Sequence, residues 1–345
     1  MHSLSPELRP IPVGSIPHTD PHRACQLTLE HFTDLPSWPQ LPRRTFRENM
    51  YAQYSERFPG IVLDLEEERV WVDRAQDLDP ALEALYMATI DDDLSYGELS
   101  PDYALGLHTF LEAVPQLDRE LAYVKGQVTG PVSWGLTVVD GDRRPILYDE
   151  ILADAVAKHL RLQARWQERI LRGVCEHTIM SVDEPYMSSY GSAYVSLGRE
   201  QAIEWMEEVF SGIEGIVMVH CCGNTDWSLL LATSVDILSF DAHEYAMNLA
   251  LYPDEIAGFL QRGGILAWGI TPKGPAAYGE SVDSLVEKLL AGIDLLVEKG
   301  LHRDDVMRAS LVSPSCGLGG LSEDLAERIY ALTAGVSQAM RERYA

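Results

Sequence analysis

Short apolar runs rich in β-branched residues recur along the chain, and most are separated by longer stretches with helical periodicity. The strand-like runs cover residues 11–15, 121–128, 177–182, 215–220, 236–240, 264–270 and 308–312. The helical stretches have apolar residues three and four positions apart, and they cover 153–174, 199–210, 252–261, 281–299 and 322–343. Strands that alternate with helices predict a parallel sheet.

The number of strands favours a closed barrel. Seven runs are visible and residues 60–64 offer an eighth, so the expected fold is α/β, a single (β/α)8 TIM barrel spanning residues 1–345. The Pro-rich segment 35–42 and the acidic segment 64–68 are interpreted as parts of an N-terminal insertion. An open doubly wound sheet stays possible, but no GxGxxG or GxxxxGK[ST] motif follows any run, which removes the main reason to prefer it.

Charge and composition narrow the classes of partner and the compartment. The chain has 27 basic and 53 acidic side chains and a net charge of -26, which opposes binding to nucleic acid or anionic membranes. No apolar stretch reaches the length of a membrane span, and residues 1–10 have no secretory pattern, so we expect a cytoplasmic protein. Five cysteines are too few for a disulfide framework, and we expect them to be reduced.

A histidine and a cysteine lie two residues apart at the end of the fourth run. Because strand side chains repeat every two residues, His220 and Cys222 face one side of the strand and Cys221 faces the other. Another thiol, Cys316, follows the last run. If both runs belong to one parallel sheet, the three side chains can converge on a metal ion at the edge where such folds keep their active sites.

Imidazole nitrogen and thiolate sulfur are the ligands that zinc prefers, and a catalytic zinc site leaves one position for the substrate. Cys316 lies far beyond Cys222 in the chain, unlike the tight CxxC pairs of structural zinc modules. This spacing favours a catalytic zinc-thiolate site. Buried, inert thiols beside a hydrogen-bonded histidine are the alternative that the spacing leaves open.

Polar residues end three other runs. Asp183 and Glu184 follow the third run and Asp241 follows the fifth. At the carboxyl end of a barrel strand, carboxylates can hold a substrate ammonium group, act as general base or complete a metal's ligand set. Capping of the next helix or pairing with arginine explains them equally well. The hydroxyl and amide of Ser15, after the first run, can bind a carboxylate, and a plain turn is the alternative.

Six strand-end motifs follow one another in a fixed order. They are Gly14–Ser15, Thr129–Gly130–Pro131, Asp183–Glu184–Pro185, His220-x-Cys222, Asp241 and Cys316–Gly317–Leu318. Together they resemble the catalytic, C-terminal domain of cobalamin-independent methionine synthase, within the superfamily that this family shares with uroporphyrinogen decarboxylase. The resemblance covers nearly the whole chain and is to the short, single-domain core type.

The resemblance implies a zinc ion held by His220, Cys222 and Cys316. It places Asp241 where the family has a glutamate ligand, and the aspartate stem is one methylene shorter. It also implies that Ser15 binds the carboxylate and Asp183 the amino group of homocysteine. The expected reaction is methyl transfer to the homocysteine sulfur, which gives methionine.

Two departures from the full-length family bear on the methyl donor. The chain has sequence for one barrel, whereas those members have an additional N-terminal barrel that helps to bind folate. Segment 273–281 also lacks the histidine acid that they carry after the seventh strand. A methylated folate nitrogen needs a proton to leave and cobalt(I) does not, so we expect a methylcorrinoid donor, presented by a corrinoid protein.

Other functions stay open at this level. The same zinc chemistry would serve methyl transfer to another thiol, such as coenzyme M. A non-catalytic barrel that binds a corrinoid or an amino acid would need the same pocket without turnover. A decarboxylase would not need zinc, and the thiol pair argues against it.

Overall fold

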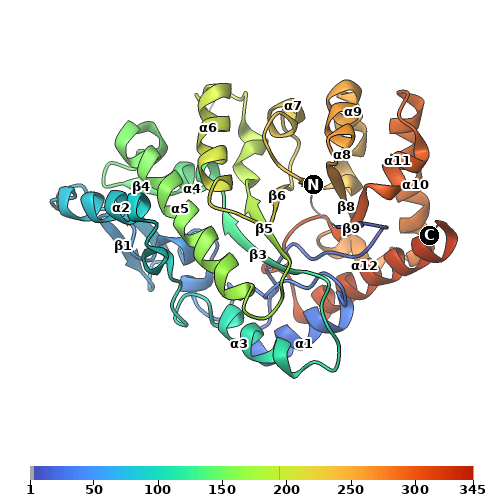
Figure 1. Ribbon diagram of the computed structural model, residues 1–345, viewed down its shortest axis with the longest axis horizontal. Helices are drawn as coiled ribbons and strands as arrows, with labels where there is room; N and C mark the ends of the chain where they lie inside the picture. Colours follow the sequence, from blue (N-terminus) through green and yellow to red (C-terminus); the bar gives the residue numbers. More distant parts are fainter. Residues whose placement is uncertain (1–3, 194, 345) are drawn as a thin grey trace.

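A parallel sheet forms the centre of the molecule (Figure 1). The computed structural model describes residues 4–193 and 195–344. The six strands are ordered β3-β5-β6-β7-β8-β9. Their bounds are β3 (Val124–Thr129), β5 (Thr178–Asp183), β6 (Ile216–Cys221), β7 (Ile237–Phe240), β8 (Ile265–Thr271) and β9 (Ser310–Pro314). All neighbours pair in parallel, so six predicted strands and their predicted direction are confirmed.

The strands are buried on both faces, as is usual for a parallel sheet covered by helices. Every residue of β3, β6, β7, β8 and β9 is buried. In the register of the sheet, Asp183 pairs with His220 and His220 pairs with Ser239. Three adjacent strands therefore each present one polar side chain at the same level near their carboxyl ends.

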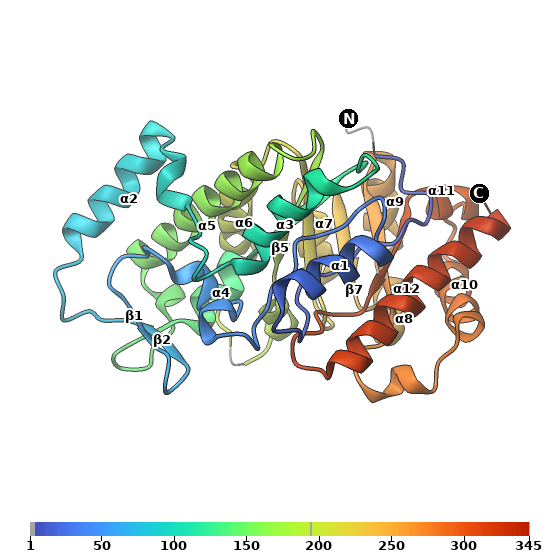
Figure 2. The same cartoon turned by 90° about the horizontal axis from the view of Figure 1, so that it is seen from below.

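Helices flank this sheet on its outer side (Figures 1 and 2). They are α1 (Pro21–His31), α3 (Leu105–Ala113), α4 (Pro131–Thr137), α5 (Glu150–Leu171), α6 (Arg199–Phe210), α7 (Trp227–Leu231), α8 (Ala242–Leu249), α9 (Pro253–Gln261), α10 (Val282–Glu298), α11 (Arg303–Arg308) and α12 (Glu323–Tyr344). Helices α5, α6, α9, α10 and α12 confirm the predicted helical stretches. Within the described residues, no helix has the length and apolar character required to cross a bilayer.

The longest of the helices beside the first strands, α5, shows how local sequence sets an element. Its N-cap Asp149 accepts hydrogen bonds from the amides of Ile151 and Leu152, both at 3.1 Å. Its buried positions, such as Leu152 and Val156, recur at helical spacing and form the apolar face. The cap and the apolar face together fix where α5 starts and how it lies against the sheet.

Two hydrophobic clusters occupy the two faces of the sheet. The larger joins the helices to the outward-facing strand residues, including Cys221 of β6. The smaller consists of inward-facing residues early in the strands, together with two residues from the N-terminal part of the chain: Ile11, Leu35, Tyr123, Ile179, Ile216, Met218, Ile237, Ile265, Ala267 and Leu311. The apolar inner cluster thus fills the amino-terminal half of the inner face and leaves the carboxyl-terminal half to polar residues.

The two edges of the sheet are linked by extended segments on either side of α1. Before this helix, Pro10 forms a parallel bridge to Val312 of β9. After it, Ser37 forms a parallel bridge to Lys125 of β3, and Ser15 bridges the two segments to each other. The Pro-rich segment 35–42, which we interpreted as part of an insertion, therefore lies against the sheet.

The prediction of an eighth strand at residues 60–64 is wrong. Strand β1 (Ile61–Asp64) pairs antiparallel with β2 (Arg69–Val72) in a separate three-stranded sheet completed by β4 (Val139–Asp140). The Asp64 side chain accepts two amide hydrogen bonds in the acidic turn that follows, so the chain folds back at once as a hairpin. This small sheet and helix α2 (Asp79–Asp91) lie at one end of the molecule, away from the central sheet (Figure 2).

Candidate metal centre and its cavity

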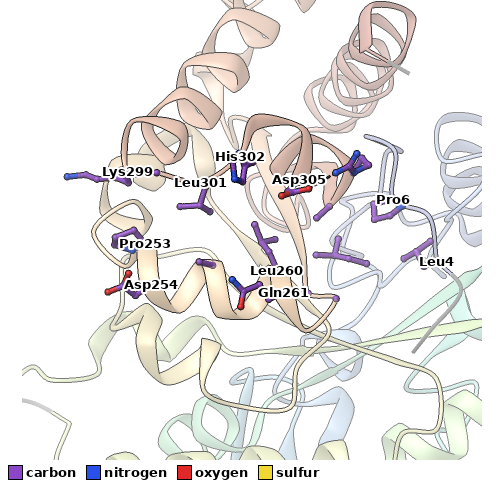
Figure 3. A pocket seen from close by; sticks show the side chains of 17 residues that line it. Leu4, Pro6, Pro253, Asp254, Leu260, Gln261, Lys299, Leu301, His302 and Asp305 are labelled. Atoms are coloured by element: carbon purple, nitrogen blue, oxygen red, sulfur yellow. Dashed lines mark hydrogen bonds and ion pairs between the residues drawn. The ribbon is translucent and has the colours of Figure 1, made fainter.

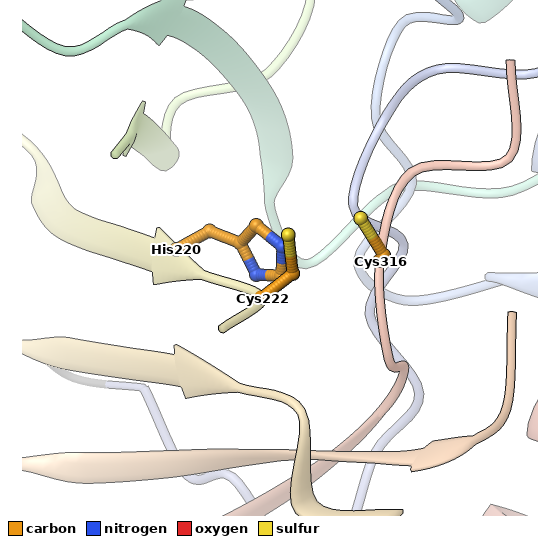
Figure 4. A group of neighbouring side chains, drawn as sticks. All are labelled: His220, Cys222 and Cys316. Carbon is orange, nitrogen blue, oxygen red and sulfur yellow. The ribbon is translucent and has the colours of Figure 1, made fainter. Parts of the chain in front are cut away.

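Three side chains from two distant parts of the chain meet at the carboxyl ends of the strands (Figure 4). His220 is on β6, Cys222 follows that strand, and Cys316 follows β9. One ring nitrogen of His220 and the two sulfur atoms all lie within 4.8 Å of one another. The predicted convergence of these three residues is therefore present in the structure.

The adjacent cysteines face opposite sides of the sheet. Cys222 turns with His220 toward the inner side, whereas Cys221 is fully buried in the cluster beneath the helices. Burial raises the pKa of the Cys221 thiol to about 12, and its sulfur lies 3.5 Å from the carbonyl oxygen of Gly223. Cys221 is therefore an inert core thiol, as the strand periodicity predicts.

His220 is held by a residue that the sequence reasoning missed. Its Nδ1 lies 2.9 Å from the hydroxyl oxygen of Ser239, the residue paired with it on β7. Its Nε2 is buried and has no hydrogen-bond partner among the described residues. Because Nδ1 is occupied by Ser239, Nε2 is the nitrogen left to bind a metal. The only signal in the sequence was the position of Ser239 on the inward face of the next strand.

The two thiols of the group act on each other. The hydrogen bond from Cys316 lowers the pKa of Cys222, and the same interaction, together with burial, raises the pKa of Cys316. A single negative charge shared by two sulfur atoms is the state that this contact favours. Such a pair is suited to bind a cation, which would stabilise both sulfurs as thiolates.

Lys273, which follows β8, places a positive charge beside the thiols. Burial lowers its pKa, but the charges of Cys316, Cys222 and Asp241 outweigh this effect, so the net shift is upward. Its amide also donates to the hydroxyl of Ser315, at 3.0 Å, which ties it to the chain next to Cys316. The sequence reasoning did not assign a role to this lysine.

Asp241 lies near the three residues but outside their group. It is the N-cap of α8, where it accepts a hydrogen bond from the amide of Glu244 at 3.1 Å. Burial raises the pKa of its carboxyl group to about 6. Helix capping accounts for this position, and the role of Asp241 as a fourth metal ligand stays a prediction.

A cavity of about 430 Å³ opens beside the three side chains and is lined by all of them. Two residues predicted to bind substrate, Ser15 and Asp183, are part of its wall. Asp183 accepts a 2.6 Å hydrogen bond from the hydroxyl of Ser181. Residues that the sequence reasoning did not select also line it, among them Gln40, Arg43, Asn49 and Gln127.

Comparison with known proteins adds information on the fold alone. No protein-family model and no curated protein sequence matches the chain. A B12-independent methionine synthase from Shewanella sp. W3-18-1, solved in complex with selenomethionine, is 16% identical with a TM-score of 0.62, over 97% of this chain and 98% of that one. A methyltransferase from Methanosarcina mazei is 14% identical with a TM-score of 0.58, over 95% and 86%.

A Listeria monocytogenes protein assigned as a vitamin-B12 independent methionine synthase gives the same picture, at 12% identity and a TM-score of 0.59 over 96% of each chain. The chain has the fold of the B12-independent methionine synthases. This fold is the one that the ordered strand-end motifs led us to expect. At these identities the likeness does not extend to the reaction.

Within this methionine-synthase fold, Glu184 lies in the core beneath the start of α4. It is fully buried and is not part of the cavity wall. Its carboxylate accepts hydrogen bonds from the amides of Val132 and Ser133, at 2.9 and 2.8 Å, and from the Ser133 hydroxyl at 2.6 Å. Burial raises the pKa of Glu184 to about 7. These bonds anchor the first turn of α4, and a role of Glu184 in substrate binding stays a prediction.

A buried lysine lies below the cavity on the inner face of β3. The ammonium group of Lys125 donates to the carbonyl oxygen of Val13 at 2.6 Å and lies 3.4 Å from the side-chain oxygen of Gln127. Burial lowers its pKa to about 8. Lys125 and Gln127 therefore support the turn that carries Ser15 into the cavity.

A larger cavity, about 670 Å³, lies at the opposite end of the strands of this methionine-synthase fold (Figure 3). Its wall includes Ile265 at the start of β8, Leu260 of α9, and His302 and Asp305 at α11. The amino ends of barrel strands generally serve stability, whereas active sites lie at the carboxyl ends. The smaller cavity, which contains the thiols, is therefore the candidate active site.

Proposed function

We propose that this protein is a zinc-dependent methyltransferase that transfers a methyl group to a thiol, with homocysteine as acceptor and methionine as product. The observation that carries the proposal is the group of His220, Cys222 and Cys316, in which a buried ring nitrogen with no hydrogen-bond partner among the described residues lies beside two sulfurs. The fold shared with B12-independent methionine synthases supports the same reaction.

The residues present fit a zinc ion. One imidazole and two thiolates are soft and borderline ligands typical of zinc, and three protein ligands leave a position for a substrate. Asp241 or the substrate would supply the fourth ligand. When bound, the cation would lower the pKa of a coordinated substrate thiol, so that the thiol is deprotonated at neutral pH.

The remaining residues bind and orient the acceptor. Asp183, in the cavity wall, would accept hydrogen bonds from the substrate ammonium group, and Ser181 orients its carboxylate. Ser15 would donate to the substrate carboxylate through its amide or hydroxyl. With both ends of the amino-acid group fixed, the sulfur would be held at the three ligands, and the rate gain would come from proximity and orientation.

We infer a methylcorrinoid as donor, presented by a corrinoid protein. His220 is the only histidine among the described residues of the cavity wall. His243, which contacts Glu280 in the loop after β8, is outside the wall, and its ring nitrogens face Glu244, Glu280 and Lys288. Because this wall offers no second histidine among its described residues to act as an acid, it suits a methyl donor whose leaving group needs no proton. The sulfur–methyl bond would form as the cobalt–methyl bond breaks, and the electron pair of that bond would stay on cobalt.

We also infer that the six strands and the two bridged segments around Pro10 and Ser37 form one (β/α)8 barrel and a single domain over residues 1–345. The three parallel bridges that link β9 to β3 support this closure. All five cysteines are free, which fits the reducing conditions of the cytoplasm.

The test combines metal analysis with an assay. The purified protein is analysed for zinc and then incubated with methylcobalamin and homocysteine, with methionine formation as the readout. One bound zinc and methionine production support the proposal. Methylation of coenzyme M in place of homocysteine would overturn the acceptor assignment, and transfer only from a methylated folate would overturn the donor.

A binding barrel without turnover is the outcome that would overturn the catalytic proposal altogether. It would show zinc and tight association with homocysteine or methylcobalamin, yet no methylated thiol with any donor. Absence of zinc from protein purified and refilled under reducing conditions would overturn the metal centre as well.

A further inference from the structure

Arg43 lies at the mouth of the cavity and holds the loop that follows Cys316. Its Nε donates to the carbonyl oxygen of Gly319 at 3.2 Å, and its Nη2 donates to that of Gly320 at 2.7 Å. Arg43 and both glycines line the cavity. Its Nη1 has no hydrogen-bond partner among the described residues, so part of the guanidinium is free to bind a ligand.

The loop held by Arg43 rests tightly on the neighbouring chain. A Cβ atom on Gly317 would lie 2.3 Å from the Ser15 hydroxyl, and one on Gly319 would lie 2.5 Å from the Pro42 ring. The amide of Leu318 also donates to the carbonyl oxygen of Ser15 at 2.8 Å. These contacts connect Cys316, the second sulfur of the candidate metal centre, to the residues at the cavity mouth.

The charges in the cavity require a cation for any anionic substrate group. The wall contains the carboxylate of Asp183 and two thiols, in a protein of net charge -26. Among the described residues of the wall, Arg43 is the only one with a permanent positive charge. Lys273 is not part of this wall and lies beside the sulfurs of Cys222 and Cys316. Guanidinium groups bind carboxylates through two parallel hydrogen bonds.

We propose that Arg43 binds the carboxylate of the thiol substrate and so makes the site specific for thiols that carry an anionic group. The same guanidinium holds the loop after Cys316, so substrate binding also fixes the position of the Cys316 sulfur. This inference rests on the proposed function and goes beyond it, because the resemblance gives the carboxylate to Ser15 alone.

The test uses the protein loaded with Co²⁺, which accepts the same tetrahedral nitrogen and sulfur ligands and absorbs light when a thiolate binds. Two thiols are titrated: homocysteine, and 3-aminopropane-1-thiol, which lacks only the carboxylate. The variants are Arg43→Ala, Arg43→Lys and the control Arg47→Ala, whose guanidinium lies over the Tyr103 ring outside the cavity wall.

We expect Arg43→Ala to weaken homocysteine binding by about ten- to a hundredfold, the usual effect of losing hydrogen bonds to a charged group. Binding of 3-aminopropane-1-thiol should stay within about twofold of wild type, because it makes no such bonds. Arg43→Lys should recover part of the affinity for homocysteine, since it keeps the charge without the planar fork. Arg47→Ala should match wild type for both thiols.

Equal weakening of both thiols by Arg43→Ala, or no weakening of either, would overturn the role of Arg43 and leave the proposed function intact. If the wild-type spectrum responds to neither thiol, the proposed function and this inference fail together. The resting cobalt spectrum of each variant shows whether the metal centre is still folded.

Discussion

Two buried histidines each make one side-chain hydrogen bond but lie in different surroundings. His159 on α5 bonds the carbonyl oxygen of Tyr54 through Nε2, at 2.9 Å, and its Nδ1 has no partner among the described residues. His220 bonds Ser239 through Nδ1, also at 2.9 Å, and here it is Nε2 that has no partner in the described part of the chain.

The difference lies in what surrounds the free nitrogen. His159 lies in the outer core against the rings of Phe58 and Trp134, with ring centroids 5.4 and 6.4 Å away. His220 is on the inner face beside the sulfurs of Cys222 and Cys316. A buried histidine with one unpaired nitrogen is therefore a metal-ligand candidate only when other ligands lie within reach.

The largest expected effect is the loss of zinc on substitution of the two inward-facing cysteines, in contrast to Cys221 on the outer face. Cys222→Ser and Cys316→Ser should each reduce zinc affinity by more than the ~10- to 100-fold that loss of an outer hydrogen-bond partner costs, and should abolish methyl transfer. Cys221→Ser should keep its zinc, because that thiol faces the helices. Zinc content and activity of the three variants provide the measurement, and equal zinc loss in all three would contradict the facing of β6.

His159 should make the fold sensitive to acid. Burial lowers its pKa from 6.5 to about 4, so the unfolded chain binds a proton in this range and the folded protein does not. Stability from this group is complete above pH 6.5 and is lost as the pH falls toward 4, by about 3 kcal/mol in total.

Denaturant unfolding of wild type and His159→Leu between pH 7 and 4 tests this prediction. The variant lacks the titrating ring, so the difference in free energy of unfolding should shift in its favour as the pH falls. Two curves that stay parallel over this range would contradict a neutral His159 in the folded state.

Ser239 should matter for the metal and Ser181 for the substrate. Ser239→Ala removes the hydrogen bond to His220 and should weaken zinc binding by about ten- to a hundredfold. Ser181→Ala, equally buried on the inner face, removes a hydrogen bond to Asp183 and should raise the KM for homocysteine with zinc affinity unchanged. Zinc competition with a chelator and steady-state kinetics separate the two; the reverse pattern would contradict the assignment of these serines.

The smallest expected effect is a change in the KM for homocysteine on substitution of glycines in the loop of residues 317–320, after Cys316. Gly317→Ala would bring a methyl group to 2.3 Å from the Ser15 hydroxyl, which can move by a change of rotamer. The cost of that change corresponds to roughly a two- to tenfold rise in the KM for homocysteine. Gly320→Ala is the matched control, because an added Cβ there meets no atom within 4 Å. An equal KM for both variants would show that the loop is not tightly seated on Ser15.

Local periodicity predicted much of this protein. Alternation along β6 placed His220 and Cys222 on one side and Cys221 on the other, because strand side chains alternate whatever the rest of the fold does. The apolar runs predicted the six central strands for a similar reason, since strands buried on both faces are apolar throughout. Failure came at residues 60–64, where a suitable strand pattern turned out to belong to a hairpin in another sheet.

The sequence by itself determined the six central strands and their parallel direction, the five long helical stretches, and which residue types reach the carboxyl ends of the strands. Only the tertiary structure decided that Cys316 lies beside Cys222 and that Ser239 forms a hydrogen bond with one ring nitrogen of His220. It also decided that Arg43 forms hydrogen bonds with the loop after Cys316. The physical reason is the distance along the chain over which each kind of interaction acts. Strand and helix patterns depend on neighbours a few positions away, whereas these contacts join segments that only the closing of the sheet brings together.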